Sequence, residues 1–131
     1  MRSNAREQLQ QIRETVLALH KALLDSERTA YEIVHGAIAS PGAFLQLLIN
    51  EPWFSWLQPV TTLIVQIDET LAAKKPPAED AQLEQLIGDT RALFTAPRDT
   101  TEFWRRYSGV VQRDPAVRVL VDELDEQFSH L

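Results

Sequence analysis

The apolar residues of the first forty positions repeat with the period of one long amphipathic helix. Seven of them recur at spacings of three, four or seven: Leu9, Ile12, Val16, Leu19, Leu23, Ala30 and Val34. These spacings place them in one stripe along a helix. A helix from Ala5 to about Ala39 is about 50 Å long, so its stripe needs several packed helices or a second subunit to cover it. We expect it to end between Gly36 and Ser40, because glycine and the following Ser-Pro-Gly stop helices.

The rest of the chain divides at its prolines into shorter helical segments. We expect them at residues 41–50, from between 53 and 59 to 73, at 78–95, at 100–113, and from 115 to near the C-terminus. Lys74-Lys75-Pro76-Pro77 is the clearest linker, and Ala96-Pro97 and Asp114-Pro115 mark two further breaks. No segment alternates as a strand does. The sequence therefore predicts one all-α domain over residues 1–131, an irregular helical bundle of five to six helices organised on the long N-terminal helix.

Composition narrows the classes of function. The net charge of −6 argues against a nucleic-acid partner, whose phosphates attract a basic surface. The absence of cysteine excludes a disulfide framework and thiolate chemistry. The N-terminal residues are too charged for a signal peptide. Asn50, Glu51, Pro52 and Pro59 interrupt the apolar run that follows, so we expect no membrane span and a cytoplasmic protein.

Few residues suggest metal binding or catalysis. Glu32 and His35 form one Glu-x-x-His pair, whereas di-iron bundles use that pair twice together with further glutamates. His20 lies fifteen residues before His35, more than about 20 Å along a helix, so the two histidines do not share an ion. Glu32 and His35 are weak metal candidates, and ordinary surface or core roles are favoured. No catalytic serine arrangement or phosphate-binding loop occurs, and we expect no cofactor.

The most aromatic part of the chain is Pro41 to Asp68. Within it, four large apolar residues occupy five consecutive positions: Trp53, Phe54, Trp56 and Leu57. If these positions form one helical turn, one buried face does not hold all four side chains. Three interpretations stay open: packing in the core alone, core packing combined with a dimer interface, or the wall of a ligand pocket.

A set of arginines accompanies the aromatic residues near the fifth predicted helix. Arg98, Arg105, Arg106 and Arg113 occur at spacings typical of one helical side, beside Trp104 and Tyr107. Such a set binds phosphates or acidic partners. The last helix is acidic, however, so pairing between these two helices is the favoured interpretation.

Two stretches carry a resemblance to a known group. Residues 17–32, LALHKALLDSERTAYE, and residues 44–69, FLQLLINEPWFSWLQPVTTLIVQIDE, together resemble a group of small bacterial proteins of unknown function. That group has a Leu-His-Lys, Glu-Arg, Tyr-Glu helix and an Asp-Pro-Trp-Phe-x-Trp-Leu core, and Glu51 stands here in place of its aspartate. The resemblance implies a helical, cytoplasmic bacterial protein without an established activity. Its characteristic polar residues here are His20, Lys21, Glu27, Arg28, Tyr31 and Glu32.

These patterns favour a non-enzymatic interaction or structural module over an enzyme. We expect it to form a homodimer, or to bind a protein partner, through the long helix and the aromatic segment. The residues expected at an interface or pocket are His20, Glu27, Tyr31, Trp53, Phe54 and Trp56. The alternative is a bundle that binds a metal or small ligand, with catalytic use of His20, Glu32 and His35. A polar ladder of His20, Glu27 and Tyr31 also serves to join helices by buried hydrogen bonds, which is the favoured role.

Overall fold

The computed structural model describes residues 4–95 and 102–131. These residues form seven helices and no strand. The helices are α1 (Ala5–His35), α2 (Pro41–Asn50), α3 (Pro52–Ser55), α4 (Gln58–Ala72), α5 (Asp80–Thr95), α6 (Glu102–Arg113) and α7 (Pro115–Ser129). The predicted break at Ala96-Pro97, the expected helix start at Thr100 and Arg98 lie outside the described ranges. The predicted all-α class and the long N-terminal helix are confirmed.

The described residues form seven helices, where five to six were expected, because the segment after Pro52 divides. Pro52 begins the four-residue α3, and Trp56 and Leu57 form a turn before α4 starts at Gln58. Prolines occupy the first turns of both helices, where the missing backbone N–H has no helical acceptor in any case. The predicted single helix after residue 53 is therefore two helices with a bend between them.

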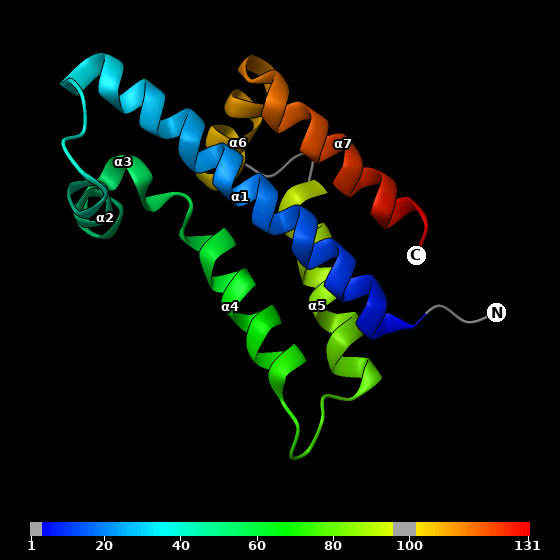
Figure 1. The fold of residues 1–131 in the computed structure, drawn as a ribbon. Coiled ribbons are helices and arrows are strands. Elements are labelled where there is room, and N and C mark those ends of the chain that lie inside the picture. The colour runs from blue at the N-terminus through cyan, green and yellow to red at the C-terminus, as the bar shows by residue number, and fades with distance from the viewer. Residues whose placement is uncertain (1–3, 96–101) are drawn as a thin grey trace.

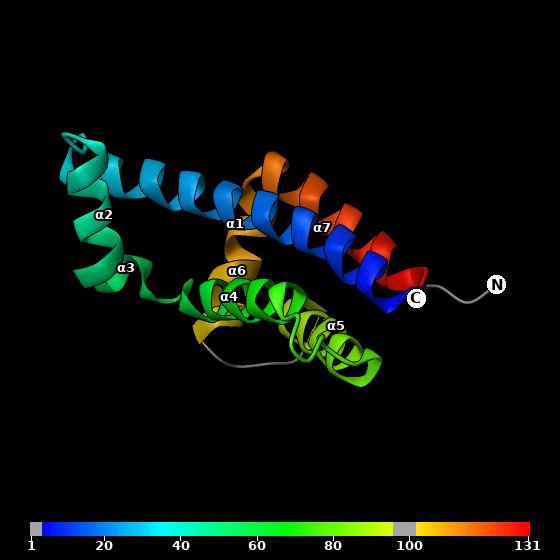
Figure 2. The ribbon, with the colours of Figure 1, turned by 60° about the horizontal axis from the view of Figure 1, so that its bottom comes forward.

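Long helix α1 forms the centre of the bundle (Figure 1). Helix α7 runs alongside α1, while α4 and α5 form a second layer that packs against it (Figure 2). The predicted stripe on α1 is fully buried as far as Leu23: Leu9, Ile12, Val16, Leu19 and Leu23 expose at most 1% of their surfaces. Each buried leucine or isoleucine contributes about 1.5–3 kcal/mol, so this half of α1 anchors the fold.

The helix ends follow the expected capping chemistry. The side chains of Ser40 and Asp114 accept hydrogen bonds from backbone N–H groups in the first turns of α2 and α7. Helix α1 ends at His35 and is capped by Gly36, whose backbone φ of +90° is favourable for glycine and costly for other residues. The stop predicted between Gly36 and Ser40 is therefore confirmed at its first residue.

The predicted stripe on α1 is wrong in its last two turns. Ala30 is only half-buried and Val34 is 63% exposed, and the last buried residue of α1 is Glu27. Periodicity alone does not say where the covering helices stop. The last turns of α1 extend away from α4 and α5, and α2 and α3 lie at this end (Figure 2). We call residues 28–35 together with α2 and α3 the distal end.

Candidate interaction surface

Helix α2 is the most apolar helix of the distal end, yet it contributes nothing to the core. Its sequence is PGAFLQLLIN, and none of its ten residues is buried. The distal end accordingly carries four of the large apolar side chains that are most exposed to solvent. They are Ile33 at 80%, Ile49 at 67%, Val34 at 63% and Leu45 at 55% exposure. Single exposed apolar residues are common, but a group at one end of a molecule indicates an interaction site.

An aromatic cluster attaches α2 and α3 to the end of α1. The ring of Tyr31 lies 4.4 Å from that of His35 and 5.5 Å from the rings of both Trp53 and Phe54. Phe44 of α2 packs edge-on against Phe54 at 5.7 Å. Aromatic pairs at such distances contribute about 0.5–1.5 kcal/mol each beyond the area they bury. The distal end is thus held in place by ring contacts rather than by the main core.

Polar contacts brace the same region. The carboxylate of Glu32 accepts a hydrogen bond of 2.8 Å from the backbone N–H of Ile38, just past the end of α1. Arg28 lies 3.7 Å from the other oxygen of Glu32, and its guanidinium sits 4.9 Å from the centre of the Phe44 ring. Glu32 and Arg28 therefore fix the bend between α1 and α2.

The two weak metal candidates have other contacts. His35 packs on Tyr31 and Trp53, and Glu32 holds the helix bend. No group of three or more histidine, aspartate or glutamate residues suited to a metal ion occurs within residues 4–95 and 102–131. Among the described residues, Glu32 and His35 therefore belong to no metal-binding group, and the alternative metal-binding role gains no support from them.

Glu27 is the one buried carboxylate among the described residues, and it joins three parts of the chain. Its Oε2 atom accepts a hydrogen bond of 3.2 Å from the indole Nε1–H of Trp56. Its Oε1 atom accepts a bond of 2.7 Å from the guanidinium of Arg113 at the end of α6. Both oxygens are thus paired, as a buried charge requires. This contact marks the boundary between the core and the distal end.

The expected pairing of the arginine-rich helix with the last helix is not found. Arg113 pairs with Glu27 of α1, and Arg106 pairs within α6 with Glu102 at 3.7 Å. Among the described residues, no ion pair joins α6 to α7. The sequence pattern did not predict Glu27 as the partner of Arg113, because the two residues are 86 positions apart.

His20 ties α1 to α4 beside an apolar hollow. Its Nε2 atom lies 3.2 Å from the hydroxyl oxygen of Thr61. The two residues line a hollow of about 380 Å³ together with Leu48 and Ile49 of α2 and Phe54. Burial lowers the pKa of His20 below its ordinary value of 6.5, because a charged imidazole loses water there. The ladder predicted from His20, Glu27 and Tyr31 therefore makes three separate contacts.

The four large residues around Trp53 do not share one helical turn. Phe54, Trp56 and Leu57 are buried and Trp53 is half-buried. The bend after Ser55 sends Trp56 and Leu57 into the main core, whereas Trp53 and Phe54 join the distal cluster. The structure thus brings together Tyr31, Trp53 and Phe54 of the predicted site, and it places His20, Glu27 and Trp56 on the core side.

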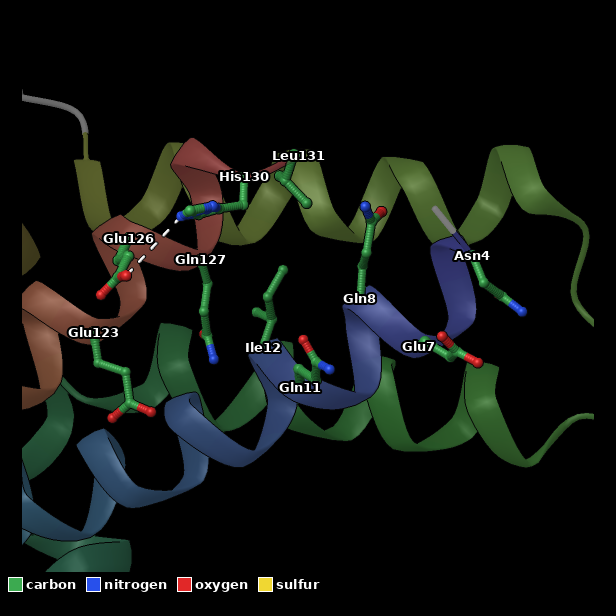
Figure 3. A pocket seen from close by; sticks show the side chains of 10 residues that line it. All are labelled: Asn4, Glu7, Gln8, Gln11, Ile12, Glu123, Glu126, Gln127, His130 and Leu131. Carbon is green, nitrogen blue, oxygen red and sulfur yellow. Dashed lines mark ion pairs between the residues drawn. The ribbon is translucent and has the colours of Figure 1, made fainter. Parts of the chain in front are cut away.

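Another hollow lies at the opposite end of the molecule, between the start of α1 and the end of α7 (Figure 3). It measures about 570 Å³, and its walls include Glu7, Glu123 and Glu126. Glu126 is 4.0 Å from His130 within α7. Its walls also include the apolar side chains of Ile12 and Leu131, so the lining mixes acidic and apolar groups, whereas α2 carries no charged residue.

Comparison of the chain with protein-family models, with curated proteins and with solved structures finds no match. Among the described helices, none combines the length and the apolar composition that a membrane span requires.

Proposed function

We propose that this protein is a non-enzymatic interaction module that forms a homodimer through its distal end. The observation that carries the proposal is α2, an apolar helix with no buried residue. A helix of this composition is normally covered on at least one side. Leu45 and Ile49 are its most exposed apolar side chains, and Ile33 and Val34 of α1 are also exposed at this end of the molecule.

A second copy of the chain fits this surface better than a charged partner does. Helix α2 carries no charged residue, whereas the whole chain has a net charge of −6. Two copies repel one another over most of their surfaces and repel least where the charge is absent. A two-fold dimer covers the same patch on both subunits at once, so one exposed helix face per chain is enough.

The burial of most of α1 supports an interface limited to the distal end. The first two thirds of α1 are covered within one chain by α4, α5 and α7. The sequence suggested self-association through the long helix as a whole. The interface proposed here comprises only the last two turns of α1 together with α2. Stable interfaces bury about 800 Å² on each partner. One ten-residue helix and two turns of α1 supply an interface at the small end of that range, so the dimer should depend on concentration.

Sedimentation velocity over a range of concentrations tests the proposal. We expect the wild-type chain of 14.9 kDa to shift toward twice its mass as concentration rises. Ile49→Glu places a charge in the centre of the uncovered face, and the variant should remain monomeric. Ile49 is 67% exposed, so the substitution leaves the core intact.

Val119→Glu is the matched control. Val119 is 66% exposed on α7, outside the distal end, so this variant adds the same charge at an equally exposed apolar site. It should dimerise like the wild type. A monomeric wild type at every concentration, or equal loss of the dimer in both variants, contradicts the proposal.

A further inference from the structure

The apolar hollow beside His20 lies where the chain passes from one layer of the bundle to the other. Helices α2 and α3 make this passage between α1 and α4 (Figure 2). The hollow measures about 380 Å³, which lies at the lower end of the range for small-molecule sites. Of the four exposed apolar residues of the distal end, Ile49 alone also lines it. The inference drawn from this hollow therefore does not rest on dimer formation.

Most of the lining is apolar, and none of it carries a permanent charge. Its apolar walls are formed by Leu24, Leu48, Ile49, Phe54 and Leu57. The described residues that line it include no aspartate, glutamate, lysine or arginine. An ion that entered the hollow would lose water without gaining an opposite charge. The hollow therefore suits a neutral molecule with an apolar body.

The two hydrogen bonds of Thr61 decide which nitrogen of His20 carries the proton. The Thr61 hydroxyl donates to the backbone carbonyl of Leu57 at 3.5 Å. Because its single proton is used there, its oxygen accepts the bond of 3.2 Å from the Nε2–H of His20. Burial lowers the pKa of His20 and so favours the neutral imidazole, which has only one N–H. The Nδ1 atom is therefore left with a lone pair and no proton.

This Nδ1 atom is an acceptor without a partner. The contact with Thr61 is the one side-chain hydrogen bond of His20 within the described residues, and it uses Nε2. The unpartnered polar side-chain atoms that are closed off from solvent lie on Trp53, Tyr107 and Gln127, and Nδ1 of His20 is not among them. His20 and Thr61 both line the hollow. The polar group that this ring offers to a small molecule is thus an accessible acceptor.

We propose that the hollow binds a small neutral alcohol with a compact hydrocarbon body, whose hydroxyl donates a hydrogen bond to Nδ1 of His20. A ketone offers only an acceptor, which cannot bond to a second acceptor. Amines and carboxylic acids of this size are charged at neutral pH, and the lining has no opposite charge for them. A hydroxyl is neutral and donates, and its oxygen can accept from the amide of Gln58, the third polar residue of the lining.

Three probes built on one six-membered ring test this ligand class. Cyclohexanol carries a donating hydroxyl, cyclohexanone carries only an acceptor, and cyclohexanecarboxylate carries a negative charge. Binding to the full chain at neutral pH is followed by NMR shifts of the backbone amides near His20 and Thr61. Cyclohexanol should bind with a Kd on the order of 1 mM, typical of so small a ligand. The other two probes should bind at least about tenfold more weakly.

The ring nitrogens of His20 give a second readout, which a change of fold would not imitate. In the free protein, the ¹⁵N resonances should show Nε2 as the protonated nitrogen and Nδ1 as the unprotonated one. Cyclohexanol should move the Nδ1 resonance toward the protonated range, because this atom gains a hydrogen bond. The Nε2 resonance should stay in place, since its bond to Thr61 is kept.

His20→Gln keeps a donor for Thr61 and removes the acceptor at the position of Nδ1. Its affinity for cyclohexanol should fall about tenfold, as expected for a lost hydrogen bond, while its weak affinity for cyclohexanone should not change. His130→Gln is the matched control. It makes the same substitution on a side chain that is 70% exposed at the end of α7, and it should bind cyclohexanol like the wild type.

Any of three results overturns this proposal: a proton on Nδ1 instead of Nε2 in the free protein, no shift near His20 with cyclohexanol, or unchanged cyclohexanol affinity in His20→Gln. Leu45→Glu keeps this test apart from that of the dimer. Leu45 is an exposed residue of α2 that does not line the hollow. The variant should lose the dimer and still bind cyclohexanol like the wild type.

Discussion

At the scale of single residues, the burial of His20 disfavours the charged form of its imidazole. It is half-buried, its Nε2 atom contacts the hydroxyl of Thr61 at 3.2 Å, and burial lowers its pKa below 6.5. The unfolded chain, in which the imidazole is in water, takes up a proton at the ordinary pKa. In the pH range between these two pKa values, the unfolded state therefore binds more protons than the folded state.

We expect this difference to make the fold less stable in acid. As pH falls through 6.5 toward the lower pKa of the folded state, the free energy of unfolding decreases, by less than about 1.4 kcal/mol per pH unit for one proton. His20→Gln removes the proton while its amide still reaches Thr61. Urea unfolding of both proteins above and below pH 6.5 should show the wild type losing stability relative to the variant. A constant difference between them at all pH values contradicts the assignment.

Other residue-scale contacts show the limits of sequence interpretation. The sequence marks His20, Glu27 and Tyr31 as a group because they lie on one side of α1. Their partners come from distant positions: Trp56 is 29 residues from Glu27, and Arg113 is 86 residues away. Helical spacing predicts which residues share a face. It holds no information on which distant side chain reaches that face.

At the scale of the elements, the end of α1 depends on one glycine. Gly36 has φ +90° and ψ 170°, a region that only glycine occupies without strain. Gly36→Ala should lower the free energy of unfolding by about 1–3 kcal/mol. No heavy atom that a new Cβ would approach lies within 4 Å, so the cost comes from the backbone alone.

Gly88→Ala is the matched comparison for this substitution. Gly88 lies inside α5, and a Cβ there also meets open space. Alanine should therefore stabilise the helix, by about 0.5–1 kcal/mol. Urea denaturation of the two variants should give opposite signs relative to the wild type. Equal changes in the two variants contradict the role of Gly36 at the helix end.

Element boundaries also show why part of the fold was predictable. Local signals fix the helix ends, as the caps at Ser40 and Asp114 illustrate. Burial is a different matter. The apolar period of α1 continues to Val34, but the helices that cover it stop near Glu27. The length of the apolar stripe on a helix follows from the local sequence. Whether the stripe is buried depends on how far the neighbouring helices extend along it.

At the scale of the whole molecule, a bundle with a buried core is joined to the distal end, whose helix α2 is not buried. The bundle of α1, α4, α5, α6 and α7 holds the buried core, whereas α2 buries none of its residues. Local opening costs least where few apolar contacts are lost. Within a single chain, α2 should therefore unfold locally far more often than the buried half of α1.

This contrast gives a prediction that links stability to self-association. If a second copy covers α2, its backbone amides should exchange with solvent more slowly as the protein concentration rises. Amides of α5, which lies inside the bundle, should exchange at the same rate at every concentration and serve as the internal reference. Hydrogen–deuterium exchange measured by mass spectrometry on the full chain resolves the two helices in separate peptides.

The Ile49→Glu variant distinguishes protection of α2 by a second copy from protection by its own chain. Its α2 amides should exchange as quickly at high concentration as those of the dilute wild type, because the charge keeps the copies apart. Val119→Glu should retain the concentration dependence of the wild type. Equal α2 exchange in dilute and concentrated wild-type protein means that α2 is protected by its own chain or not at all. In that case the aromatic contacts of Tyr31 and Phe54 hold the distal end without a partner, and the uncovered face of α2 is not a dimer interface.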